Sequence, residues 1–191
     1  MKKLFTAVCL FILAHSLNAA DYIAIGDMRF FKAYESPAAD VKIREYLPKG
    51  EKLERWNRMV TVQLHKNLKN PEDALKQIAG FVKKSNPAAH AELLKNEQTG
   101  DVLLDFIVFA PPGTPEHYSE WNMMRGKYVE GAGLILYLYA MRIYSVTESN
   151  VDKAITLIRE ERTKMMPLFI KASFEEQKEP DKAPAKQNQK K

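Results

Sequence analysis

The sequence has very little cysteine: Cys9 is the only one among 191 residues. Cys9 lies in an N-terminal segment that we expect to be removed, so the mature chain is predicted to have no disulfide, thiol nucleophile or thiolate metal site. Charge of one sign is not in large excess either, because 29 basic residues face 24 acidic ones. The formal net charge of +5 is therefore too small and too dispersed to indicate nucleic-acid binding.

Several catalytic and metal-binding motifs are also missing. Three histidines follow residue 20, His65, His90 and His117, and none belongs to a zinc-binding helix motif. The sequence has no acidic calcium loop, no glycine-rich phosphate loop, and no serine with glycine at both second neighbours. We therefore expect no metal and no cofactor, and an enzyme would need a site dispersed along the chain.

The first twenty residues have the organisation of a secretory signal peptide. Lys2 and Lys3 precede the apolar run 4–14, and small residues end the segment at Ala19 and Ala20. The apolar run is shorter than the roughly 20 residues that a membrane-spanning helix needs. We expect cleavage after Ala19 or Ala20, which would lower the formal charge from +5 to +3. The sequence thus predicts a periplasmic or secreted protein without a stable membrane span after cleavage.

Composition divides the remaining chain into one domain and a tail. Residues 21–172 carry the apolar patterns of a single folded domain. Residues 173–191 hold five lysines and four acidic residues, with no aliphatic side chain larger than alanine after Phe174. Such a segment buries too little apolar surface to fold, so we expect a disordered tail.

The first half of the domain predicts short strands followed by a helix. Asn70 is a favoured N-cap, Pro71 suits the first helical position, and Pro87 ends the pattern at Asn86. Residues 88–95 are interpreted as a second, short helix. The strands are expected at 22–25, 28–34, 42–47 and 59–64.

The second half predicts three strands and one helix. Strands are expected at 102–109, 118–128 and 134–144; both alternating sets of 134–144 are apolar, which is typical of a strand covered on two faces. A helix opened by Thr147 or Ser149 should be kinked or ended by Pro167. The fold class is therefore α+β: an antiparallel sheet flanked by two main helices, in a single domain.

Two groups of residues are candidates for chemistry. His117 stands between the carboxylates of Glu116 and Glu120, where it could bind a metal or transfer a proton, or simply lie at a solvated strand edge. Asp105 interrupts an apolar strand. If it is buried it needs a partner, for which Arg125 and Arg142 are candidates; the alternatives are a structural ion pair or an edge position facing water.

The aromatic residues suggest a binding surface. His117, Tyr118, Trp121 and Tyr128 follow the proline-rich loop 110–115 and are the expected ligand or partner surface, although core packing also explains most aromatic residues.

The segment Glu45–Glu51, with Trp56 and the run Met59–Gln63, resembles a segment of secreted bacterial proteins whose layout is similar to the PsbP-like and DcrB-like sandwiches. The resemblance implies an antiparallel sheet flanked by helices and an accessory or binding role without an agreed catalytic site. It implies no functional residue.

Together these features favour a non-catalytic envelope domain that binds a partner protein or a small apolar ligand. The alternative is a periplasmic hydrolase, metal-dependent or built on carboxylates and histidine, that uses Glu116, His117 and Glu120.

Overall fold

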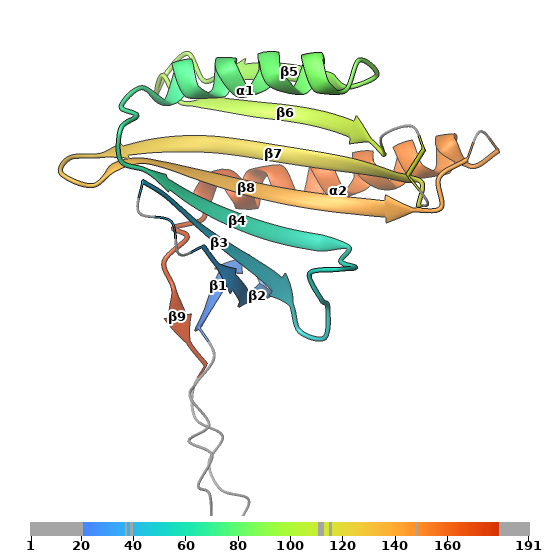
Figure 1. The fold of residues 1–191 in the computed structure, drawn as a ribbon, viewed down its shortest axis with the longest axis horizontal. Helices are drawn as coiled ribbons and strands as arrows, with labels where there is room; N and C mark the ends of the chain where they lie inside the picture. Colours follow the sequence, from blue (N-terminus) through green and yellow to red (C-terminus); the bar gives the residue numbers. More distant parts are fainter. Residues whose placement is uncertain are drawn as a thin grey trace, which may run out of the picture.

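The computed structural model describes residues 21–36, 38, 40–110, 113–114, 116–147 and 149–179. The expected signal peptide, most of the expected tail, and Pro111, Pro112 and Pro115 lie outside these residues. The described part is one domain with a nine-stranded antiparallel sheet and two helices (Figure 1). Neither helix of this part is long and apolar enough to cross a membrane.

The sheet joins strands that are distant in sequence. Its order is β5-β6-β7-β8-β4-β3-β2-β1-β9, so the N-terminal strands β1 to β4 meet β5 to β8 through the pairing of β4 with β8. The elements are β1 (Asp21–Ile25), β2 (Met28–Glu35), β3 (Val41–Pro48), β4 (Arg58–His65), α1 (Pro71–Ser85), β5 (His90–Lys95), β6 (Val102–Phe109), β7 (Tyr118–Val129), β8 (Gly133–Tyr144), α2 (Val151–Lys171) and β9 (Gln177–Lys178).

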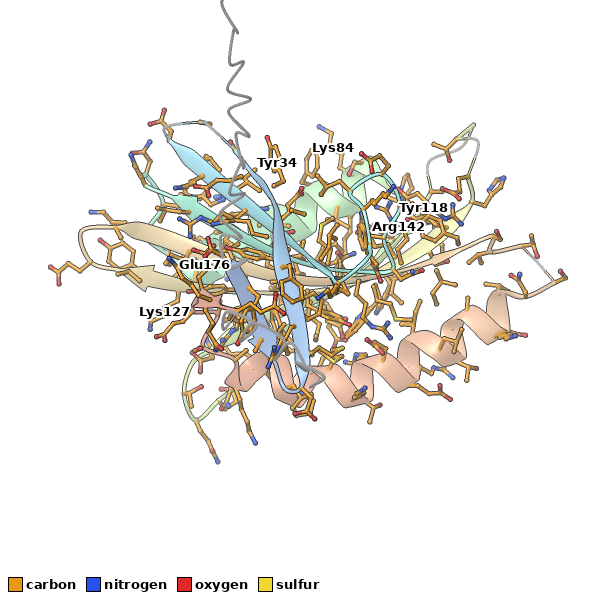
Figure 2. The ribbon with its side chains drawn as sticks, turned by 90° about the horizontal axis from the view of Figure 1, so that it is seen from below. Tyr34, Lys84, Tyr118, Lys127, Arg142 and Glu176 are labelled. Atoms are coloured by element: carbon orange, nitrogen blue, oxygen red, sulfur yellow. The ribbon has the colours of Figure 1, made fainter. Side chains whose placement is uncertain are left out.

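The two helices pack on opposite faces of the sheet (Figure 2). Adjacent strand residues show this directly: Met123 belongs to the core under α2, and Met124 to the core under α1. Strand β8 contributes to both cores, with Tyr139 on the α2 side and Leu136 on the α1 side. The apolar alternation predicted for a strand covered on both faces is thus confirmed.

Helix α1 begins and ends at the residues that the sequence predicts. The Asn70 side chain accepts hydrogen bonds from the backbone N–H groups of Glu72 (2.9 Å) and Asp73 (3.2 Å). Pro71 opens the helix, and Asn86 is its C-cap. Leu75 and Val82 then face the sheet and are buried.

The prediction of a second, short helix at residues 88–95 is wrong, and so is the alternative in which Pro167 ends the last helix. Residues 90–95 form β5, because pairing with β6 and burial of Ala91 outweigh the helical preference of this segment. Helix α2 begins after Asn150 and continues through Pro167 to Lys171. Met165 and Phe169 on either side of Pro167 are fully buried, and their packing holds the helix together across the missing hydrogen bond.

The domain also extends beyond residue 172, where the sequence places the start of the tail. Phe174 is buried and stacks on Tyr137 with ring centroids 4.4 Å apart. Glu176 accepts a hydrogen bond of 2.7 Å from Tyr46, and strand β9 pairs with β1. Phe174 thus brings residues 173–178 to the core. The average composition of the C-terminal segment could not show this interaction.

Candidate functional site

The structure does not bring the four expected surface residues together. Tyr118 and Tyr128 lie at opposite ends of β7, about 33 Å apart at the usual rise per strand residue. The Trp121 side chain points to the face of the sheet opposite to that of Tyr118 and Tyr128, and it is fully buried in the core under α2. His117 is exposed just before β7. Figure 2 shows the separation of the two strand ends, with Tyr118 near one and Lys127 near the other.

Tyr118 belongs instead to an aromatic cluster that surrounds Arg142. The Arg142 guanidinium carbon lies 4.2 Å from the ring centroid of Trp56 and 4.3 Å from that of Tyr118. Glu120 holds the guanidinium with hydrogen bonds of 2.9 and 2.6 Å. Burial alone would lower the pKa of Arg142, but the interactions with Glu120 and Tyr144 raise it above its ordinary value. The cluster is therefore already filled by a cation of the chain itself.

The residues of the alternative hydrolase site are also engaged separately. Glu116 pairs with Arg55, and Glu120 pairs with Arg142. Within the described part of the chain, no three histidine, cysteine or acidic side chains are placed to hold a metal ion. His117 is consequently not assembled with its two neighbouring carboxylates into a site here.

Asp105 is buried on the α2 face of β6, and its partners differ from those that the sequence suggested. It accepts a hydrogen bond of 2.7 Å from the indole N–H of Trp121 and one of 2.5 Å from Nε of Arg162 on α2. Neither Arg125 nor Arg142 contacts it, because Arg142 points to the other face and Arg125 binds backbone carbonyls. The structural ion pair, one of the expected alternatives, is therefore what the fold contains.

A pocket of about 350 Å³ lies beside this ion pair, between the N-terminal half of α2 and strands β5 to β7. We call it the first pocket. Its wall is mostly apolar and includes Trp121, Ile107 and Phe109 from the sheet, with Ile155 and Ile158 from α2. It exists because α2 crosses the sheet without covering the edge strand β5, whose residues His90 and Glu92 also line the pocket.

A second pocket, of about 720 Å³, lies farther along the same helix. Its apolar wall is formed by Leu94, Leu103, Tyr137, Met166 and Ile170. The basic residues Lys95, Arg125, Lys127 and Lys171 also line it, together with the acidic residues Asp101 and Glu175, although the Lys95 side chain pairs with Glu72 on α1.

Arg125 fixes the end of α2 beside the second pocket. Its guanidinium donates to the carbonyl oxygens of Ile170 (2.7 Å) and Ala172, where the helix dipole is negative. The guanidinium carbon lies 5.1 Å from the ring centroid of Phe174 and 5.6 Å from that of Tyr137. Burial lowers the pKa of Arg125 below its ordinary value. A charged group thus stays partly buried with carbonyl dipoles and aromatic rings as its partners.

A buried network holds the middle of α2 on the sheet. Glu161 accepts hydrogen bonds from Arg58 Nε (2.7 Å) and Nη2 (3.0 Å) and from the Tyr139 hydroxyl. Burial raises the pKa of Tyr139, and the hydrogen bond to Glu161 raises it further. The position of α2, and with it the shape of both pockets, therefore depends on this network.

Sequence reasoning missed the two pockets. The helical positions that line them recur every three to four residues along α2, which is a visible signal, but it equally indicates a core-facing stripe. Only the position of α2 across β5 to β7 shows that part of the stripe is uncovered.

Comparisons with known proteins give a family and no close relative. One protein-family model matches residues 17–174. Searches of the curated proteins and of the solved structures found no match.

Proposed function

The chain belongs to the family whose model matches residues 17–174, and for the domain within this match we propose a non-catalytic binding function in the bacterial envelope, with a small apolar ligand in the first pocket. The proposal includes the secretory signal peptide, a periplasmic or secreted location, and a layout of the PsbP-like kind. The fold on which this proposal rests is a nine-stranded antiparallel sheet with a helix on each face.

The observation that carries the proposal is the apolar wall of the first pocket. Its volume of about 350 Å³ is within the usual range for sites that bind small molecules. The charges of Asp105 and Arg162 at its end neutralise each other, and the Trp121 N–H is already bound to Asp105. The remaining surface therefore favours hydrocarbon over a polar ligand.

The other candidate functions have less support. A partner surface built from His117, Tyr118, Trp121 and Tyr128 would need residues that lie on two faces and at two ends of β7. A hydrolase would need Glu116 and Glu120, which are held in separate ion pairs. Ligand binding under α2 uses groups that the fold leaves available.

Two helix positions make a matched test. Ile155 and Leu157 are exposed to a similar degree on α2, at 37% and 39%, but only Ile155 lines the first pocket. Ile155→Arg places a long charged side chain at the pocket mouth, whereas Leu157→Arg makes the same chemical change away from it. Both variants should remain folded because neither residue belongs to the core.

The measurement is binding of the fluorescent apolar probe N-phenyl-1-naphthylamine. In the Trp56→Phe background Trp121 is the one remaining tryptophan and reports from the pocket wall. We expect the probe to quench the fluorescence of Trp121 saturably. Leu157→Arg should leave the affinity for the probe unchanged, and Ile155→Arg should lower it at least tenfold. The absence of saturable binding, or equal binding by both variants, would overturn the proposal.

A further inference from the structure

One side of α2 lines both pockets. Positions 151, 155, 158, 162, 166 and 170 recur at helical spacing, the first four in the first pocket and the last two in the second. From Ile155 to Ile170 the helix rises about 22 Å. The two pockets are therefore successive parts of one seam between α2 and the edge of the sheet.

The β6 residues that line the two pockets follow one another on one face of the strand. Leu103, Asp105 and Ile107 alternate along β6 and all face α2. Leu103 lines the second pocket, Ile107 the first, and the Asp105–Arg162 ion pair stands at the boundary. An elongated molecule that follows α2 would thus contact both pockets and pass the paired charges.

The two ends of this seam differ in charge. The first pocket has Glu92 and Asp105 against Arg159 and Arg162, so its formal charges balance. In the second pocket Lys95 is paired with Glu72 outside it, so Arg125, Lys127 and Lys171 face the two acids Asp101 and Glu175, a formal excess of +1. The apolar end is therefore neutral and the larger end is positive.

Three of the basic residues of the second pocket are not neutralised within the described part of the chain, whereas Lys95 pairs with Glu72 on α1. Arg125, Lys127 and Lys171 form no ion pair there, and Arg125 donates to backbone carbonyls only. Arg125 Nε is buried without a hydrogen-bond partner. Lys127 and Lys171 are exposed at the pocket rim, where an anion could reach them. A partly buried cation with exposed lysines around it is a favourable environment for a carboxylate or phosphate.

We propose that the ligand is a single-chain amphipathic anion, with its carboxylate or phosphate head group in the second pocket and its alkyl chain along α2 into the first pocket. The inference rests on the proposed function, because it takes the apolar ligand of the first pocket as the chain of this molecule. It adds the head-group charge, the direction of binding and the residues that hold the anion.

The experiment compares head groups on one chain length. Binding of octadecanoate, octadecyl phosphate and octadecyltrimethylammonium to the full chain is measured by calorimetry at low ionic strength. The alkyl chains of these probes are long enough to reach from Lys171 toward Ile155. The test variant is Lys127→Gln/Lys171→Gln. The control is Lys83→Gln/Lys84→Gln, which removes two exposed charges from the last turn of α1 on the other face. Figure 2 shows Lys84 and Lys127 well apart.

We expect both anions to bind at least tenfold more tightly than the cation. The test variant should weaken both anions about fivefold, as for two exposed charge contacts, and leave the cation unweakened. The control variant should leave the affinities of all three probes unchanged. Added salt should reduce the preference for anions because it screens the exposed lysines.

The outcomes separate the two proposals. Equal binding of anions and cation, or equal loss in test and control variants, overturns the head-group assignment while the apolar ligand stands. Binding that Ile155→Arg leaves unchanged shows that the chain does not reach the first pocket and overturns the direction. If none of the three probes binds and N-phenyl-1-naphthylamine also fails, both proposals are wrong.

Discussion

Replacing Glu161 by glutamine tests how α2 is held on the sheet. The change keeps the size of the side chain but removes the charge that pairs with Arg58, and a neutral amide offers one acceptor where the carboxylate accepts three hydrogen bonds. Charged hydrogen bonds contribute about 1.5–3 kcal/mol. Because the Arg58 side chain is 34% exposed and can turn to water, we expect a loss of about 2 kcal/mol. For a domain of this size that loss lowers Tm by about 4–8 °C.

The effect should depend on pH with a defined sign. Burial alone would raise the pKa of Glu161, but hydrogen bonds from Arg58 and Tyr139 outweigh it and hold the pKa below its ordinary value of 4.5. The folded state therefore favours the ionised carboxylate. Its contribution to stability is complete above pH 4.5 and is lost as the pH falls through the lower pKa of the folded state.

The assay is urea unfolding followed by circular dichroism, at neutral pH and in acid. Glu160→Gln is the control, because Glu160 is the exposed neighbour of Glu161 on the same helix and loses the same charge. We expect Glu161→Gln to have a clearly lower free energy of unfolding than Glu160→Gln at neutral pH. This difference should become smaller in acid. Equal stabilities at neutral pH, or a difference that persists unchanged in strong acid, would refute the reasoning.

Two further substitutions test the packing of the domain. Phe174→Ala should lower the free energy of unfolding by about 3–4 kcal/mol, because it removes a buried ring stacked on Tyr137. The same urea unfolding measures this change. A loss below about 1 kcal/mol would show that residues past 172 do not support the core. Gly133→Ala should destabilise more than Gly131→Ala, because both glycines have positive φ but only at Gly133 would the new Cβ lie 2.5 Å from the His65 carbonyl oxygen. Equal Tm values for these two variants would contradict the close approach.

Local signals explain which parts of the fold the sequence predicts. The ends of α1 depend on Asn70, Pro71 and Pro87, which act within one turn of the backbone. Likewise, the two-sided burial of β8 is visible in the alternation of its own residues. By contrast, β5 has no such signal, since Ala91 and its neighbours become a strand only through pairing with β6.

The candidate site was harder to predict because it depends on distant residues. Alternation along β7 already places Tyr118 and Trp121 on opposite faces, so one surface could not include both side chains. The partner of Asp105 proved to be Arg162, 57 residues away on α2. Strand order alone cannot place a helix at a particular angle across the sheet, and the pockets result from that angle.

The pairing of β4 with β8 has a consequence for the order in which the domain folds. Residues 58–65 can pair with β3 early, but they find their second partner strand only once residues 134–141 are present, and Asp21 meets Lys178 only when nearly the whole domain is available. Contacts of such high sequence separation slow folding, because the entropy of closing long loops is lost before the contacts form. Until β8 arrives, β4 presents an unpaired edge rich in β-branched and apolar residues. We therefore expect a slow-folding chain whose N-terminal strands need protection from aggregation until β8 is complete.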